Sequence, residues 1–185
     1  MLSAALIPQK VFFTKGVGKH INRLQSFELA LRRAGVEKCN LVRVSSILPP
    51  RCKIIPRSRG LTALSPGEIT FVVLAEAATN EPSRLVGAGI GLAQPADRDQ
   101  YGYISEHHGF GTKENRLADL VEDMAATMLA TTLGIEFAPE TAYDDRKEIY
   151  RMSGKIVRSR ACVQTAEGDK QGLWTTVVSA AVFLL

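Results

Sequence analysis

Two adjacent serines, Ser45 and Ser46, are the residues of this chain that point most directly to chemistry. The residues before them, 40–44, place valines at every second position, which is the period of a β-strand. The two prolines at 49–50 cannot donate ladder hydrogen bonds, so we expect the strand to end near Ile47. The serines are therefore predicted to lie at the mouth of a sheet, where a hydroxyl can be held against the preceding carbonyl.

That position suits self-cleavage of the peptide bond between the two serines. The Ser46 hydroxyl attacks the carbonyl carbon of Ser45, and the amide becomes an ester. Elimination then releases a chain that ends at Ser45 and leaves a dehydroalanine, which hydrolyses to a pyruvoyl group. The expected products are chains of residues 1–45 and 46–185. A serine doublet before two prolines is also common in ordinary turns, so these residues alone leave both readings open.

The segment Asn40-Leu-Val-Arg-Val-Ser-Ser-Ile-Leu-Pro-Pro50 resembles the processing segment of the pyruvoyl-dependent arginine decarboxylases. The resemblance extends over nearly the whole chain, through the segments Gly16–His20, Ser26–Leu31 with Ala34–Gly35, Ser105–Gly109 and Trp174–Leu185. It implies an α+β domain built as a four-layer α-β-β-α sandwich, a covalent pyruvoyl cofactor made from Ser46, and conversion of L-arginine to agmatine and CO₂. It also implies trimers of cleaved pairs, (αβ)₃, with active sites between subunits.

Decarboxylation of an amino acid leaves electrons on the α carbon, so the reaction needs an electron sink and a proton donor. A pyruvoyl ketone forms a Schiff base with the substrate amine, and the adjacent amide carbonyl accepts the negative charge. Glu106 is the candidate proton donor, because it ends the strand-like segment 101–106 and burial would keep its carboxyl protonated. The pattern fits a surface glutamate as well, but the resemblance assigns the acid to this position. His107 and His108 remain alternative donors.

Two further residues are candidates for the site. The side-chain amide of Asn40 can donate a hydrogen bond to a carbonyl that becomes an oxyanion during the acyl shift, although a turn residue would look the same. Glu28 interrupts the apolar face of a predicted helix between Leu24 and Leu31, so its carboxylate should lie at the edge of the core or face a pocket. The resemblance implies that Asn40 acts in processing and that Glu28 binds the substrate guanidinium. The better-known archaeal members carry the shorter aspartate at the position of Glu28.

Composition narrows the class of protein. The chain has 185 residues, 23% charged and 45% hydrophobic, with a net charge of +4, which is ordinary for one globular domain. The basic segment 146–160 lacks interleaved aromatic residues beyond Tyr150, so we expect no nucleic-acid partner. The longest apolar run, 177–185, is too short to span a bilayer, and the spacing of the three cysteines fits no metal site. We expect a cytoplasmic protein with free thiols and no membrane partner.

The remaining pattern predicts two helices among about six strands. One helix is expected to end at Gly35 behind two arginines, and the other to run from Thr112 as N-cap to Gly134. Loops are expected over 15–19 and 51–67, and the expected strands lie at 11–13, 69–75, 85–93, 101–106 and 173–185. The strands 69–75 and 85–93 are expected to form a hairpin, and the segment 143–165 is compatible with a short helix and then a strand.

Alternating glycines in the strand 85–93 leave one sheet face without side chains. This face allows the close approach of a helix or of another subunit, and we expect it to contact a neighbouring protomer whose Ser46-derived group Glu106 would reach. Two other functions remain open. The chain could be a pyruvoyl-dependent decarboxylase of another amino acid, such as histidine, or an unprocessed homologue without catalytic activity.

Overall fold

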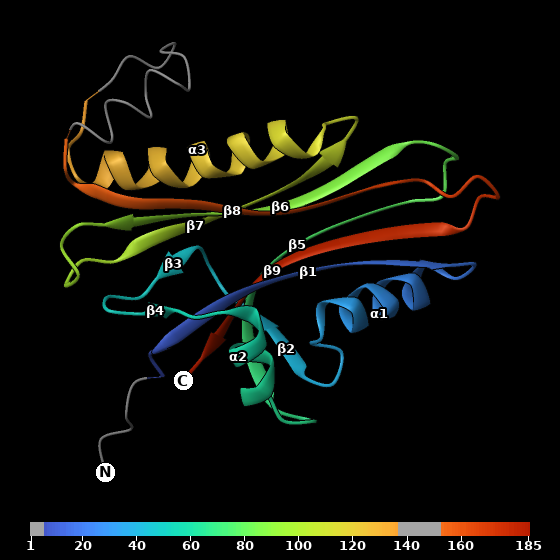
Figure 1. Cartoon of the computed structure of the whole chain (residues 1–185), viewed down its shortest axis with the longest axis horizontal. Coiled ribbons are helices and arrows are strands. Elements are labelled where there is room, and N and C mark those ends of the chain that lie inside the picture. Colours follow the sequence, from blue (N-terminus) through green and yellow to red (C-terminus); the bar gives the residue numbers. More distant parts are fainter. Residues whose placement is uncertain (1–5, 137–152) are drawn as a thin grey trace.

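The computed structural model of the chain describes residues 6–136 and 153–185 as one α+β domain with two sheets and three helices (Figure 1). The five-stranded sheet has the order β2-β5-β9-β1-β4 and consists of β1 (Lys10–His20), β2 (Asn40–Arg43), β4 (Lys53–Ile54), β5 (Ile69–Thr79) and β9 (Trp174–Leu184). The four-stranded sheet has the order β3-β7-β6-β8 and consists of β3 (Ile47–Leu48), β6 (Leu85–Pro95), β7 (Gly102–Phe110) and β8 (Ile156–Glu167). The helices are α1 (Arg23–Ala34), α2 (Arg57–Ala63) and α3 (Glu114–Thr132).

The elements stack as α3, the four-stranded sheet, the five-stranded sheet and α1 (Figure 1). The core between the sheets is apolar and includes Val11, Leu48, Val73, Ile90, Ile104 and Phe183. A second core between α1 and its sheet includes Phe12, Ala30, Val72 and Val178. The predicted α+β class is confirmed, and the order of the layers agrees with the expected sandwich. Cleavage into two chains stays a prediction.

Helix α1 lies directly on β1 because the strand carries glycine where the helix crosses it. A Cβ added to Gly16 would lie 2.1 Å from the carbonyl oxygen of Ala30, which no side chain can tolerate. The loop predicted over 15–19 is therefore wrong, since these residues continue β1. The predicted end of the helix is confirmed: Gly35 has φ +81° and donates its N–H to carbonyl oxygens of the last turn.

The alternating glycines of β6 face α3. A Cβ on Gly91 would lie 1.9 Å from the carbonyl oxygen of Val121, so this helix can pack on the strand only above glycine. Of the two expectations for this face, the contact with a helix is confirmed. The contact with a neighbouring subunit is wrong, because α3 already covers the face. Helix α3 begins about where expected, with Lys113 rather than Thr112 as its N-cap.

The hairpin expected from β5 and β6 is also wrong, because the two strands belong to different sheets. β5 pairs with β2 and β9, whereas β6 pairs with β7 and β8. The loop predicted over 51–67 contains β4 and α2, which have two and seven residues and are too short to show a periodic pattern. Of the segment 143–165, the strand is confirmed as β8, and the expected short helix at its start falls on residues outside the described ranges.

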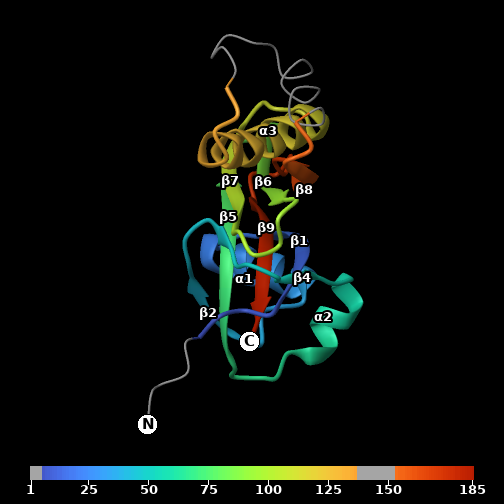
Figure 2. The ribbon, with the colours of Figure 1, turned by 90° about the vertical axis from the view of Figure 1, so that its left-hand side faces the viewer.

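The two edges of the stacked sheets differ in what closes them. Figure 2 shows β2 and β7 at one edge and β4 and β8 at the other. We call the first the serine edge, which consists of residues 42–47 and Glu106. We call the second the clasp edge, which consists of Thr14, Lys15, Glu114, Cys162 and Val163. In the described parts of the chain, no helix is both long and apolar enough to cross a membrane.

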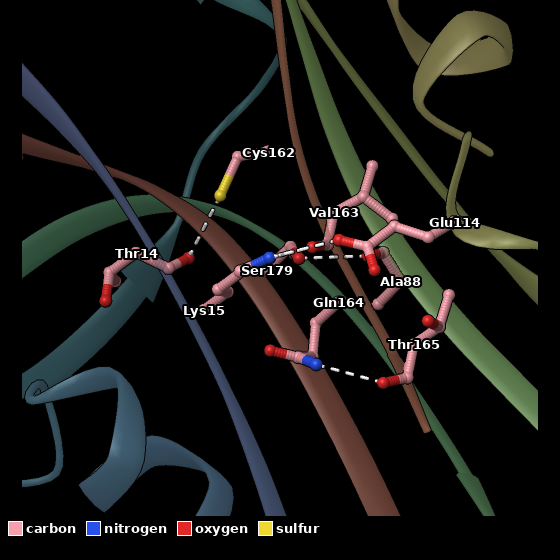
Figure 3. A network of polar contacts seen from close by, with 9 residues as sticks. All are labelled: Thr14, Lys15, Ala88, Glu114, Cys162, Val163, Gln164, Thr165 and Ser179. Carbon is pink, nitrogen blue, oxygen red and sulfur yellow. Dashed lines mark hydrogen bonds and ion pairs between the residues drawn. The ribbon is translucent and has the colours of Figure 1, made fainter. Parts of the chain in front are cut away.

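Polar contacts join the layers at and near the clasp edge (Figure 3). The Lys15 ammonium of β1 donates to the carbonyl oxygen of Val163 in β8 at 2.7 Å and pairs with the Glu114 carboxylate of α3 at 3.2 Å. Deeper between the sheets, the hydroxyl of Ser179 in β9 donates to the carbonyl oxygen of Ala88 in β6 at 2.9 Å. On this side of the sandwich, side chains of the same chain therefore join the layers through hydrogen bonds and an ion pair.

Candidate active site

The two serines lie where the chain crosses from one sheet to the other. Strand β2 ends at Arg43, and the Val44 N–H still donates to the carbonyl oxygen of Val72 in the five-stranded sheet at 2.9 Å. Two residues later, the Ser46 carbonyl oxygen accepts the Ile104 N–H of the four-stranded sheet at 2.7 Å. The bond between the serines is therefore held from both sides, by different sheets. The single strand expected to continue to Ile47 is divided into β2 and β3.

Ser46 is hydrogen-bonded through the group that a pyruvoyl product retains and not through the groups that cleavage consumes. Its carbonyl, which a pyruvoyl group retains, is bound by the Ile104 N–H. Its own N–H and hydroxyl, which processing consumes, donate no hydrogen bond among residues 6–136 and 153–185. Leu48, two residues on, is 1% exposed and anchors β3 in the inter-sheet core. The local structure therefore fits a pyruvoyl group at residue 46 without rearrangement of its carbonyl.

Glu106 lies on β7, the strand that holds Ser46. Side chains alternate along a strand, so Glu106 is on the same face as Ile104, about 7 Å further along. The strand pairing puts Ser46 opposite Ile104, so Glu106 lies two residues along β7 from the residue that binds Ser46. The side chain is exposed in the single chain, in contrast to the expected buried acid. The physical reason is that β3 has two residues and pairs only with Gly102 and Tyr103, so β3 does not cover the edge of β7 at Glu106.

The two histidines after Glu106 continue β7, and their rings form a stacked pair with centres 6.4 Å apart. His107 is half-buried and His108 is exposed. His108 shares the face of Glu106, so it is the alternative donor that the strand geometry leaves open.

Asn40 lies at the opposite end of β2 from the serines. Its side-chain amide donates to the carbonyl oxygen of Gly67 at 2.8 Å, and its backbone N–H donates to that of Glu68 at 2.8 Å. Five residues of extended strand span about 16 Å, so within one chain this amide does not reach the Ser45 carbonyl. A role for Asn40 in a site with Ser46 therefore requires that the two residues come from different chains.

Glu28 is half-buried on α1, which agrees with its expected position at the edge of the core. Its carboxylate pairs with the Arg32 guanidinium one turn later at 2.5 Å, and this hydrogen bond raises the pKa of Arg32. Exposed pairs of this kind contribute little to stability, because water and salt screen the two charges. A substrate guanidinium can therefore replace Arg32 at little cost in free energy.

The structure adds site features that the sequence did not indicate. The most specific is the main-chain N–H of Ile104, for which no sequence signal exists because every residue except proline carries this group. The others are the partly exposed valines of the serine edge, Val42 and Val44, and Ile47 of β3, with 40%, 38% and 41% exposure. The sequence shows that apolar residues alternate here, but it does not show that these side chains are exposed.

The three cysteines are unpaired, as the sequence predicted. Burial raises the pKa of Cys52 to about 11 and also raises that of Cys162, so both thiols stay protonated at neutral pH. Among the described residues, no group of three histidine, cysteine or acidic side chains is arranged to hold a metal ion.

Comparisons with known proteins bear directly on this arrangement. The profile of the family described as pyruvoyl-dependent arginine decarboxylase matches residues 10–185. This chain belongs to that family. A probable pyruvoyl-dependent arginine decarboxylase of Chloroherpeton thalassium is 61% identical over 178 residues, which are 96% of this chain and 98% of the relative. The protein named pyruvoyl-dependent arginine decarboxylase 2 of Methanosarcina mazei is 56% identical over 179 residues, 97% of this chain and 98% of the relative.

A relative from Chlorobium limicola, also named a probable pyruvoyl-dependent arginine decarboxylase, is 59% identical over 180 residues, 97% of this chain and 99% of its own length. The family name implies a covalently bound pyruvoyl group. The sequence-based assignment to pyruvoyl-dependent arginine decarboxylases is therefore confirmed. The roles of the individual residues remain predictions.

Proposed function

We propose that this protein cleaves itself between Ser45 and Ser46 and then converts L-arginine to agmatine and CO₂. Membership in the pyruvoyl-dependent arginine decarboxylase family supports the activity. The observation that carries the assignment of the site concerns Ser46. Its carbonyl oxygen accepts a hydrogen bond from the Ile104 N–H, whereas its hydroxyl makes no hydrogen bond to the described residues.

Processing requires no external oxidant or reductant. The Ser46 oxygen attacks the Ser45 carbonyl carbon, the carbon–nitrogen bond breaks, and the hydroxyl proton ends on the freed nitrogen. Loss of the Ser46 α proton then expels the Ser45 carboxylate and leaves a carbon–carbon double bond. Water then adds at the carbon that carries the nitrogen. The nitrogen leaves as ammonia, and the carbon becomes the ketone. The Ile104 N–H polarises the Ser46 carbonyl throughout and thereby makes the adjacent α proton more acidic.

In the decarboxylation, the pyruvoyl group supplies the electron sink that an amino acid needs to lose CO₂. The Ile104 N–H donates to the amide carbonyl on which charge develops, and Glu106 holds the proton that returns to the α carbon. Because Ile104 and Glu106 are two residues apart on β7, we assign both to the Ser46 of their own chain. This replaces the expectation that Glu106 serves a neighbouring protomer.

We further propose a cyclic trimer, (αβ)₃, in which Glu28 and Asn40 come from the adjacent protomer. Three observations support it: Asn40 is too far from Ser46 of its own chain, Glu106 is exposed in the single chain, and apolar side chains flank the serines. A general acid requires exclusion of water, and a neighbouring protomer on the serine edge would provide it.

The proposed activity is tested by product analysis with a panel of amino acids. Agmatine from L-arginine, with no amine from lysine or ornithine, supports the proposal. Histamine from histidine would instead identify a decarboxylase for that amino acid. A single intact mass, without products, would identify an unprocessed homologue.

Mixed trimers test the origin of the site residues. Glu106→Gln mixed with a processed Glu28→Gln protein should recover part of the activity, because some sites then combine the intact Glu106 of one chain with the intact Glu28 of another. Glu106→Gln mixed with Ser46→Ala should recover none, since both residues are assigned to one chain. Recovery in the second mixture would show that Glu106 acts across the interface.

A further inference from the structure

A strongly basic pocket of ≈ 320 Å³ lies just beyond the serines in the chain, between residues 51–59 and the end of β6. Its lining contains four cationic side chains and no carboxylate; the cations are Arg51, Lys53, Arg59 and Arg98. Gln94 adds a neutral amide to the lining. None of these residues is used by the processing or decarboxylation chemistry described above.

Most of this positive charge is not neutralised by the protein. Arg51 pairs with Asp99 at 2.5 Å, and this contact lowers the pKa of the Asp99 carboxyl. Within the described residues, Lys53, Arg59 and Arg98 have no carboxylate partner. Like charges gathered in one pocket repel one another, and a bound anion relieves this repulsion.

The backbone at the pocket is held in an unfavourable conformation. Arg51 has φ +58°, which a residue with a side chain adopts at a cost in free energy. The conformation is kept by the Arg51 N–H, which donates to the carbonyl oxygen of Arg98 at 3.0 Å, and by the pair with Asp99. These contacts bring the two arginines to the same pocket from segments that are 47 positions apart in the sequence. Strain of this kind is typical of ligand-binding sites.

A larger pocket of ≈ 700 Å³ at the clasp edge provides a comparison. Three cations line it, one fewer than in the smaller pocket, and each has a structural contact. Lys15 pairs with Glu114, Arg57 donates to carbonyl oxygens at the end of α1, and the Arg160 guanidinium lies 5.3 Å from the centre of the Phe13 ring. The cations that remain available to a ligand are therefore those of the smaller pocket.

We propose that the pocket of Arg51, Lys53, Arg59 and Arg98 binds a phosphate dianion, either free or as a small phosphate monoester. Guanidinium groups present paired N–H donors that match phosphate oxygens, and a lysine adds a compact charge. The volume accommodates such an anion. Binding would tie residues 51–59, which follow Ser46 in the cleaved chain, to the segment around Arg98, and would add to the stability of the folded state.

The test is titration of the full-length protein with inorganic phosphate at constant ionic strength, with sodium chloride as the balancing salt. Saturable binding by calorimetry and a rise in the thermal midpoint are expected. Arg59→Gln and Arg98→Gln should each weaken binding about tenfold or more, as for the loss of one hydrogen bond to a charged group. Both side chains are exposed, so the variants should fold.

The matched control is Arg116→Gln, which removes the same charge from an exposed position on α3 that does not line the pocket. Equal weakening by Arg116→Gln, or an equal thermal shift with chloride alone, would overturn the proposal, because the effect would then be general screening. A titration with glycerol phosphate distinguishes the two sources: tighter binding than inorganic phosphate identifies an ester as the ligand, and weaker binding identifies free phosphate. The measurement does not depend on decarboxylation, so it also applies to Ser46→Ala.

Discussion

The serine edge and the clasp edge close the same two sheets in different ways. At the clasp edge, the side chain of Lys15 reaches from β1 to β8 and α3, and the layers are joined by polar contacts within one chain (Figure 3). At the serine edge, the sheets are joined by the chain itself, which crosses between them at the bond proposed to be cleaved. Here apolar side chains and Glu106 are exposed instead.

The difference indicates that the two edges have different roles. The contacts of the clasp edge do not involve the crossover, so they can hold the layers together before and after cleavage. Among the described residues, no side chain of the serine edge makes a polar contact that joins the two sheets, and we propose that a neighbouring protomer covers this edge. We therefore expect substitutions at the serine edge to change processing, catalysis or assembly, and substitutions near the clasp edge to change stability alone.

The largest effect should follow from Ser46→Ala, which removes the nucleophile. Intact mass should show one chain of full length, whereas Ser45→Ala should still give two fragments, since only the carbonyl of Ser45 takes part. The larger wild-type fragment should resist Edman degradation, because a pyruvoyl group has no free amine. Cleavage of Ser46→Ala would place the nucleophile elsewhere.

The next effect should be that of Glu106→Gln. The amide keeps the shape of the side chain but cannot supply the proton, so decarboxylation should fall about 10²-fold or more while processing continues. His108→Gln, on the same face of β7, is the matched control and should retain most of the activity. Wild-type turnover by a fully cleaved Glu106→Gln protein would exclude the residue as the acid.

A charge at an apolar position of the serine edge should disrupt assembly. Val42→Asp places a carboxylate where we propose subunit contact, so light scattering should show the mass of one αβ pair instead of three. Ile21→Asp, at a more exposed apolar residue between β1 and α1, should leave the mass unchanged. A wild-type protein that is monomeric and fully active would rule out the trimer.

The smallest effect is expected between the sheets. Ser179→Ala removes the buried hydrogen bond to Ala88 and should lower the free energy of unfolding by about 1 kcal/mol. Ser45→Ala at the exposed crossover should change it by less than about 0.5 kcal/mol. Urea unfolding of both variants in an uncleaved Ser46→Ala background measures the difference. An equal loss at the two positions would contradict the division between the edges.

The family and the main elements around the serine doublet were predictable from the sequence. The signals were local: alternating valines before two prolines predict a strand end, and Gly35 behind Arg32 and Arg33 predicts a helix end. The glycines of the strand 85–93 also predicted a close contact, but they left open whether a helix or another subunit makes it. Each of these predictions depends only on residues that are neighbours along the chain.

Which strands share a sheet followed from long-range packing and not from local patterns. Strands β5 and β6 resemble a hairpin in sequence, yet they belong to different sheets, because the pairing depends on β9, which lies some 80 residues further along the chain than β6. The same packing brings the Ile104 N–H to Ser46. A main-chain donor has no signature in the sequence, because every residue except proline carries one. The proposed chemistry of the serines is thus a prediction from their neighbours in the sequence, whereas the main-chain partner of Ser46 was set by long-range strand pairing.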